Sequence, residues 1–221
     1  MIKSIIYTLT YIIFFIVVAI VLFINLAPQF GSNPSSEQKV FYDSFPNYSK
    51  GGFENFEATP MMTGEISTWD FFKEDSSRKP TSAILPKSIN FDSFAKTNSD
   101  YRLAWLGHSA FLINVMGKII LLDPMLGSHA APIPLPNLKR FNEVLPIKLD
   151  SVHRIDFVVI SHDHYDHLDY STIKLLKDKV SKFLAPHGIG NHLKKWGVKS
   201  NQIVELNWNE SFSFENIEFH C

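Results

Sequence analysis

The sequence predicts a layered α/β domain that follows a long apolar helix at the amino terminus. Residues 5–26 form a long, mostly apolar run without a charged residue. Residues 155–161 (IDFVVIS) have the near-continuous apolar character of a strand buried on both faces. Short strand patterns precede this segment, and helix and strand patterns alternate after it, which is typical of α/β domains.

The apolar run at the amino terminus is long enough to cross a membrane. Residues 4–36 contain no charge, and a spanning helix needs about 20 mostly apolar residues. A cleaved signal peptide would have a shorter apolar core of about 7–15 residues and a small-residue cleavage site, which Ala27-Pro28 does not supply. A buried core helix would carry a polar stripe. We therefore expect residues 1–27 to be an uncleaved single-pass membrane anchor, with the flanking charges too balanced to fix its orientation.

Residues 28–100 are expected to form an extended arm or linker. Proline and glycine interrupt every candidate element in this segment. Scattered aromatic side chains, among them Phe41, Phe53 and Trp69, make it too hydrophobic for a purely flexible linker. We expect the arm to pack on the domain surface or on lipid.

Residues 101–221 carry the pattern of the α/β domain. Met116-Gly117-Lys118 separates two short apolar runs and indicates a hairpin. Residues 171–180 and 188–196 have helical spacing, with Ser171 as a candidate amino-terminal cap and Gly197 as a stop. The remaining expected strands are 103–106, 110–115, 119–122, 183–185, 204–206 and 212–219, the last with a turn at Asn216.

Charge and cysteine content narrow the function classes. The chain has 21 basic and 22 acidic residues and a net charge of -1, so no overall field attracts nucleic acid, and no basic cluster is interleaved with aromatics. Cys221 is the only cysteine, which excludes an intrachain disulfide and a cysteine-based metal cage. Any metal ligands must therefore be histidines and carboxylates.

A dense cluster of such ligands follows the buried strand directly. His162 and His164 are two residues apart in extended chain and should point the same way, while Asp166 and His167 come a step later. The cluster lies at the carboxyl end of a strand, where α/β folds place their sites. Imidazole and carboxylate ligands without thiolate suit Zn²⁺, Mn²⁺ or Fe²⁺, with zinc the default. We interpret it as a metal site, and the lone histidines His129, His153, His187 and His192 as structural.

The ordered H-x-H-x-D-H motif after an apolar strand resembles the signature of the metallo-β-lactamase superfamily. Further segments look like the branch that contains the N-acylphosphatidylethanolamine phospholipase D enzymes, with ascorbate-phosphate lactonases as more distant relatives. These segments are Trp105-Leu106-Gly107-His108, Leu122-Asp123-Pro124, Lys139-Arg140-Phe141, SHDHYDHLDY at 161–170 and Leu206-Asn207-Trp208. The arm also resembles bacterial members at Pro46-Asn47-Tyr48, Gly52-Phe53 and Pro60-Met61-Met62-Thr63.

The resemblance implies a fold and a set of roles. His162 and His164 would hold one zinc ion, and Asp166, also the candidate catalytic carboxylate, would hold a second with His167. Asp123 would orient the site from behind the ligands, with His108 near it. A turn-forming aspartate before proline and a hydrogen-bonded structural histidine are the respective alternatives for these two residues.

The resemblance also implies an incomplete chain. The family fold is an αββα sandwich of two similar halves, and the second half supplies a further His for each zinc and an Asp that bridges both. Residues 101–221 would be the N-terminal half only, and His220 falls on a strand rather than at a ligand position. We therefore expect a truncated version of a longer enzyme.

Three functions stay open on the sequence. The first is a membrane-anchored, zinc-dependent phosphodiesterase that acts on phospholipid, in which two zinc ions activate a bridging water. The second is a lactonase or another small-ester hydrolase with the same ligands. The third is an inactive membrane-tethered fragment that lacks the ligands of the second half.

Overall fold

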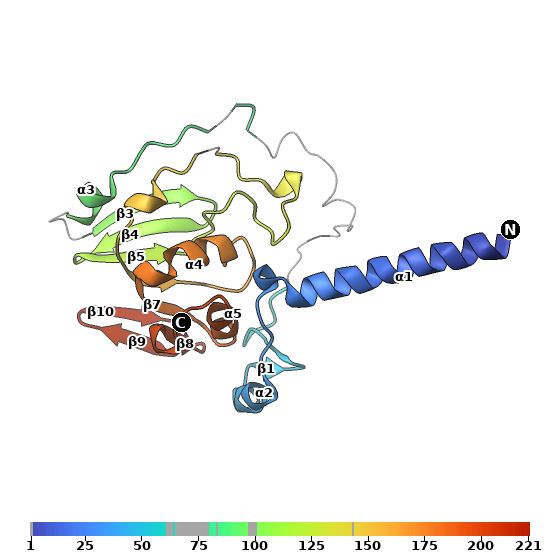
Figure 1. Ribbon diagram of the computed structural model, residues 1–221. Coiled ribbons are helices and arrows are strands. Elements are labelled where there is room, and N and C mark those ends of the chain that lie inside the picture. The colour runs from blue at the N-terminus through green and yellow to red at the C-terminus, as the bar shows by residue number, and fades with distance from the viewer. Residues whose placement is uncertain (1, 61–63, 65–79, 83, 97–100, 143) are drawn as a thin grey trace.

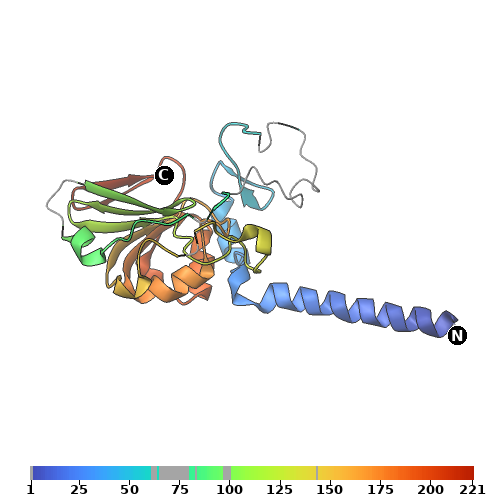
Figure 2. The ribbon, with the colours of Figure 1, turned by 90° about the horizontal axis from the view of Figure 1, so that it is seen from above.

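A long helix projects from one end of a layered domain in the computed structural model (Figures 1 and 2). The structure describes residues 2–60, 64, 80–82, 84–96, 101–142 and 144–221. The layers of the domain, from front to back in Figure 1, are helices, a six-stranded sheet and a two-stranded hairpin.

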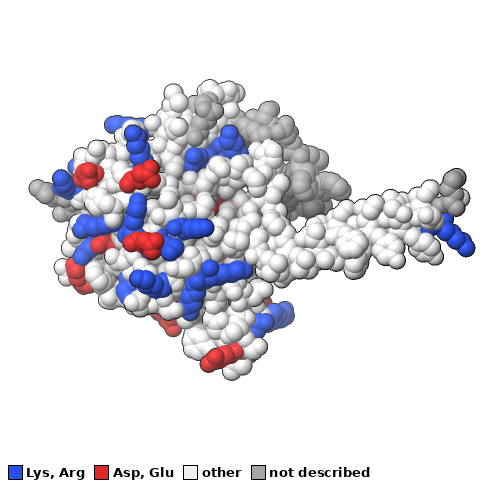
Figure 3. Space-filling view, viewed as in Figure 1, with Lys and Arg blue, Asp and Glu red and all other residues white. Residues whose placement is uncertain are grey.

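The projecting helix is α1, Ile2–Leu26, and none of its residues is buried against the rest of the protein. Among the described residues it is the one helix long and apolar enough to cross a membrane. Figure 3 shows blue atoms only at its free end, which agrees with Lys3 as its single charged residue. The helix predicted from the apolar run is therefore present, and its length and composition are those of a membrane span.

The sheet at the centre of the domain has the strand order β3-β4-β5-β6-β7-β8. The strands are β3 (Tyr101–Gly107), β4 (Ala110–Val115), β5 (Lys118–Leu122), β6 (Ile155–Val159), β7 (Val180–Pro186) and β8 (Ile203–Leu206). β4 is antiparallel to both β3 and β5, whereas β5, β6, β7 and β8 are parallel to one another. β3 thus runs in the direction of β5 to β8, and the carboxyl ends of all five meet at one edge, called here the carboxyl edge.

A two-residue turn joins β4 to β5 at the opposite edge of the sheet. Met116 and Gly117 both have positive φ, 51° and 78°, as hairpin turns that match the twist of the strands require. Glycine adopts this conformation without a steric penalty. The hairpin predicted at Met116–Lys118 is confirmed.

The principal core lies between the sheet and three short helices that cover one of its faces (Figure 2). The helices are α3 (Phe91–Ala95), α4 (Tyr170–Leu176) and α5 (Ile189–Lys195). Val158 of β6 and Phe183 of β7 pack there against Ile173 and Leu193 of the helices, and all four are almost fully buried. Burial of each such side chain stabilises the fold by about 1.5–3 kcal/mol.

The second face of the sheet is covered by the hairpin β9 (Ser211–Phe214) and β10 (Ile217–His220). The ring of Phe157 in β6 lies 5.1 Å from that of Phe214 and 4.9 Å from that of Phe219. β6 is therefore buried on both faces, as its sequence predicts. The mixed sheet between helices and a further β-layer confirms the predicted α/β fold class.

Helix α4 starts earlier and ends sooner than its spacing predicts. Asp169, not Ser171, is the amino-terminal cap, since its side chain accepts the backbone N–H of Ser171 at 3.0 Å. The prediction of Ser171 as the cap is wrong because Ser171 already lies inside the helix. Its hydroxyl and that of Thr172 donate to the buried Asp169 carboxylate. The helix ends at Leu176, and the predicted last turn is the 3-10 helix η6 (Lys177–Lys179).

The described part of the segment expected as an arm contains short elements that pack on the domain. They are η1 (Pro28–Phe30), α2 (Ser36–Tyr42), β1 (Tyr48–Ser49) and β2 (Gly52–Phe53). The rings of Phe45 and Phe53 contact that of His187, at centroid distances of 4.8 and 6.2 Å. Residues 61–63, 65–79, 83 and 97–100, which include the predicted arm aromatic Trp69, lie outside the described residues.

Candidate metal centre

The predicted ligands lie at the carboxyl edge, in the loop that follows β6. The backbone N–H groups of His167 and Leu168 donate to the carbonyl of His164 at 2.9 and 2.8 Å, so the loop closes into a tight turn. This turn brings the ring of His167 within 4.0 Å of the ring of His162, centroid to centroid. The centroids of His162 and His164 are 4.6 Å apart. Three imidazoles thus gather within a stretch of six residues.

Asp123 holds the site from the end of the neighbouring strand β5. Its buried carboxylate accepts the backbone N–H and the hydroxyl of Ser161, both at 2.7 Å, and Nδ1 of His167 at 3.0 Å. Because an ionised carboxylate can only accept, this contact keeps the proton of His167 on Nδ1 and leaves the Nε2 lone pair on the side of Asp166, whose Oδ2 is 3.7 Å away. Asp123 has a positive φ of 41°, which its short polar side chain tolerates.

His108 reaches the same group from the turn between β3 and β4. Gly107 and His108 both have positive φ, 116° and 46°, which directs the imidazole back over the carboxyl edge. Nε2 of His108 lies 2.8 Å from Oδ2 of Asp166, and that oxygen is 3.7 Å from Nε2 of His167. Ligand atoms of these three residues all lie within 4.8 Å of one another. The structure therefore places His108 against Asp166, on the open side of the cluster.

The pKa shifts in this group favour the protonation states that bind metal. Burial, followed by the neighbouring His167 and His164, lowers the pKa of His162 below its ordinary value of 6.5. Burial acts to raise the pKa of Asp166, but hydrogen bonds from His108 and the backbone outweigh it and hold that pKa below 3.8. At neutral pH His162 is an uncharged imidazole and Asp166 an ionised carboxylate.

The donor set fits a divalent metal ion. His162, His164, Asp166 and His167 come from one loop. Among the described residues, the ligand atoms that converge within 4.8 Å of one another belong to His108, Asp166 and His167, and His162 and His164 lie outside that group. His167 has the carboxylate partner on its second nitrogen that metal-binding histidines ordinarily have. Neutral nitrogen and carboxylate oxygen donors without thiolate match zinc, and they also match iron and manganese.

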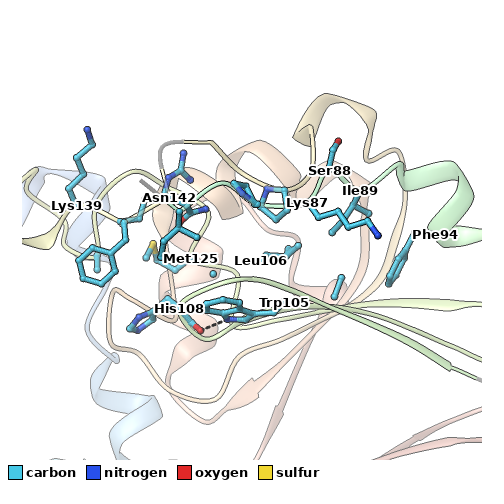
Figure 4. Close-up of a pocket in the computed structure, with 18 of the residues that line it drawn as sticks. Lys87, Ser88, Ile89, Phe94, Trp105, Leu106, His108, Met125, Lys139 and Asn142 are labelled. Carbon is cyan, nitrogen blue, oxygen red and sulfur yellow. Dashed lines mark hydrogen bonds between the residues drawn. The ribbon is translucent and has the colours of Figure 1, made fainter. Parts of the chain in front are cut away.

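A large cavity opens beside His108 along the helix-covered side of β3. Its volume is about 1080 Å³, and its wall is mostly apolar, with Ile89, Phe94, Leu106 and Met125 among the lining residues. Figure 4 shows His108 toward one end of this cavity and Phe94 at the other. A drug-sized ligand site has about 300–1,000 Å³, so this cavity has room for a long molecule.

Cationic side chains line the rim of the same cavity. Lys87 and Arg102 contribute from one side, and Lys139 and Arg140 from a proline-rich segment, residues 130–141, called here the proline loop. The guanidinium of Arg140 donates to the carbonyl of Leu126 at 2.8 Å, which ties the loop to the end of β5. An apolar cavity with a basic rim suits a ligand with an apolar body and an anionic group.

Comparison with known proteins relates the second half of the chain to a family. Residues 118–221, from β5 to the end of the chain, match the family described as the β-lactamase superfamily domain. The match includes Asp123 and the whole H-x-H-x-D-H loop. Residues 118–221 thus carry the domain of the metallo-β-lactamase superfamily, and similarity to named metal-dependent hydrolases supports the same superfamily. The family predicted from the motif is thereby confirmed.

Three relatives illustrate the kinship. An uncharacterised protein of Mycobacterium tuberculosis (strain ATCC 25618 / H37Rv) is 33% identical over 86% of this chain and 52% of its own length. The N-acyl-phosphatidylethanolamine-hydrolyzing phospholipase D 1 of Caenorhabditis elegans is 34% identical over 63% of this chain and 40% of its own. A metal-dependent hydrolase of Sulfurisphaera tokodaii is 29% identical over 53% of this chain and 47% of its own. The chain spans about half the length of these relatives or less, and they indicate the class of metal-dependent hydrolases.

Two features of the centre lie beyond the reach of sequence motifs. The hydrogen bond between His108 and Asp166 joins residues 58 apart, and no local spacing encodes it. Had the common direction of β3 and β6 been known, the two residues could have been placed at one edge. The cavity is likewise assembled from segments near residues 84–94, 102–108 and 125–146, which carry no shared motif.

Proposed function

We propose that this protein is a membrane-anchored, zinc-dependent hydrolase that cleaves phosphodiester bonds of phospholipids, in the manner of the N-acylphosphatidylethanolamine phospholipase D enzymes. The observation that carries the proposal is the junction of the histidine–carboxylate cluster with an apolar cavity of about 1080 Å³ at His108. The similarity to the C. elegans phospholipase supports the same substrate class.

The roles of the ligands follow from their grouping. His162 and His164 would hold one ion, and Asp166 with His167 the other. Bound zinc supplies Lewis-acid charge and a nucleophilic water of lowered pKa. Asp123 keeps the proton of His167 on Nδ1 and fixes the ring, so that the metal-facing nitrogen stays unprotonated. His108 is placed to hold the Asp166 carboxylate in its ionised form.

The size and lining of the cavity favour a lipid over a small ester or lactone. A lactone of a few carbon atoms would leave most of the 1080 Å³ filled with water against apolar walls. An acyl chain would bury that surface, and the basic rim would face the phosphodiester. We assign residues 1–27 to a membrane anchor, 28–100 to an arm and 101–221 to the first half of the hydrolase domain.

The test combines metal content with a substrate comparison. Protein reconstituted in phospholipid nanodiscs would be loaded with zinc, assayed for bound metal by mass spectrometry, and supplied with N-acylphosphatidylethanolamine or with a small lactone. We expect chelator-sensitive release of phosphatidic acid, which is lost in the His162→Ala and His164→Ala double variant together with bound zinc. His153→Ala, which changes an exposed histidine outside the cluster, is the matched control. Lipid turnover that persists in the double variant or with chelator would contradict the proposal.

A further inference from the structure

The proline loop exposes an apolar surface to solvent. Ile133, Leu135 and Leu138 are 42%, 43% and 39% exposed, and Phe141 is 52% exposed. No Asp, Glu, Lys or Arg occurs from Pro124 to Leu138. Exposed apolar side chains gathered in one short segment mark an interaction surface more often than chance.

The backbone of the proline loop is suited to an apolar environment. Pro132, Pro134 and Pro136 have no N–H to satisfy. The N–H groups of Leu135 and Leu138 donate to the carbonyls of Ile133 and Leu135, at 2.8 and 3.0 Å. A segment that approaches hydrocarbon must provide for its own backbone donors, and this loop does so at Leu135 and Leu138.

The loop lies at the end of the domain from which α1 projects. In both ribbon views the yellow 3-10 helix η4 (Pro136–Leu138) lies at the same end of the domain as the carboxyl end of α1 (Figures 1 and 2). A membrane that contains α1 would therefore run beside the loop. The turn at Met116 lies at the opposite edge of the sheet, away from this end.

A set of contacts holds α1 in this orientation. Immediately after the helix, the carbonyl of Pro28 accepts the indole N–H of Trp196 at 2.7 Å, and the carbonyl of Gly31 accepts the ammonium of Lys195. The N–H of Ser32 donates to Nδ1 of His192 at 2.9 Å. Gly31 has a φ of 69°, and a Cβ atom there would lie 1.7 Å from that Nδ1. The junction between helix and domain is thus a fixed clamp on α5, made of Pro28, Gly31 and Ser32.

We propose that the proline loop is a second membrane contact, which inserts Ile133, Leu135 and Leu138 into the headgroup region of a phospholipid bilayer while the clamp holds the domain against it. This inference rests on the membrane anchor of the proposed function. Lys139 follows the apolar run and is placed to meet lipid phosphates. Leu138, Lys139 and Phe141 also line the cavity, so the contact places the cavity mouth at the lipid surface.

The test measures the depth of single labelled positions in the full chain. The exposed Cys221 is first replaced by Ser, and Leu135→Cys is labelled with an environment-sensitive fluorophore in phosphatidylcholine nanodiscs with spin-labelled headgroups. We expect severalfold stronger quenching at Leu135 than at Met116→Cys, an exposed apolar position at the far edge. Ile13→Cys lies in the middle of α1 and reports the anchor itself, so its quenching is measured in nanodiscs whose spin label is near the end of the acyl chains. Ile133→Cys is the substitute position if Leu135→Cys does not fold.

The clamp is tested by Gly31→Ala, with Gly52→Ala as the control because a Cβ at Gly52 would meet nothing within 4 Å. We expect Gly31→Ala to lower the quenching at Leu135 and leave that at Ile13 unchanged. Quenching at Leu135 no stronger than at Met116, with Ile13 quenched, overturns the loop contact and leaves the anchor intact. An unquenched Ile13 overturns both the anchor and the inference that rests on it.

Discussion

At the scale of single residues, the metal centre depends on which atoms keep their protons. Asp123 lies behind the ligand loop, where it fixes the tautomer of His167 and the backbone of Ser161. His108 stands in front of the loop and holds the charge of Asp166. Two residues that bind no ion in the proposed centre thus determine whether the ligands are ready to bind one.

Replacement of Asp123 by Asn tests the first of these roles. The amide keeps the shape and tolerates the positive φ of 41°, but it carries no charge and offers one acceptor oxygen instead of two. We expect zinc affinity to fall about 10- to 100-fold, as for other partners of metal-binding histidines, with the fold retained by circular dichroism. Competition with a chromophoric chelator measures the affinity. Asp163→Asn, at an exposed site in the ligand loop (residues 161–167), is the control. An equal loss of zinc affinity in this control would show that Asp123 acts through its charge alone and does not position His167.

Replacement of His108 by Ala, which removes the side-chain donor, tests the second role through pH. The Asp166 carboxyl would lose its leading stabilising hydrogen bond while burial still acts to raise its pKa, so that pKa should rise above its value in the parent protein. A carboxyl with a raised pKa is protonated at higher pH and releases metal sooner on acidification. We expect zinc retention, titrated between about pH 4 and pH 7.5, to fall at a higher pH in the variant. Coincident curves would show that His108 does not control Asp166.

At the scale of elements, the sequence predicts those features that depend only on residues close together in the chain. The hairpin at Met116-Gly117 and the buried strand β6 were predictable because turn conformation and burial on two faces depend on neighbouring residues. The ligand loop was recognisable because its histidines and carboxylate lie within six residues. The cap of α4 was misassigned since Asp169 is chosen by tertiary bonds, including one from the N–H of Gly127 at 2.8 Å.

Asp169 therefore has a testable structural role, in which it ties α4 to the segment after β5. Its carboxylate is 1% exposed and accepts donors from Gly127, Ser171 and Thr172. Asp169→Ala would remove the cap and leave buried donors without partners, which should lower the free energy of unfolding by about 3 kcal/mol. Denaturant titration of the reconstituted protein measures the change. Asp178→Ala, at an exposed site just past the same helix, should leave the midpoint unchanged.

At the scale of the whole molecule, the candidate metal centre, the cavity and the junction with α1 lie at the same end of the domain. β3, β5 and β6 end at the same edge of the sheet, so His108, Asp123 and the ligand loop meet there. The cavity begins at His108, and the clamp on α5 keeps α1 at that end of the domain. The family resemblance implied that Asp123 and His108 lie near the ligands. The cavity and the clamp could not be predicted from the sequence, because they depend on contacts such as that of Ser32 with His192, 160 residues apart.

The cavity and the ligand loop are made largely of different residues, so a mutation should be able to change the role of the cavity without changing metal binding. Ala104 lines the cavity from β3 and belongs to neither the ligand loop nor its hydrogen-bond partners. Ala104→Trp would fill part of the 1080 Å³ with an indole ring and exclude an acyl chain, while zinc content should stay unchanged. We expect hydrolysis of long-chain phospholipid to fall at least about tenfold, since contacts in an apolar pocket contribute that much to discrimination per group lost. Hydrolysis of a short, water-soluble phosphodiester should be nearly unaffected, because it needs only the ligands and the basic rim.

Met116→Trp adds the same ring at the far edge and should change neither rate. An equal loss on both substrates would mean that the cavity supports the metal centre rather than the lipid.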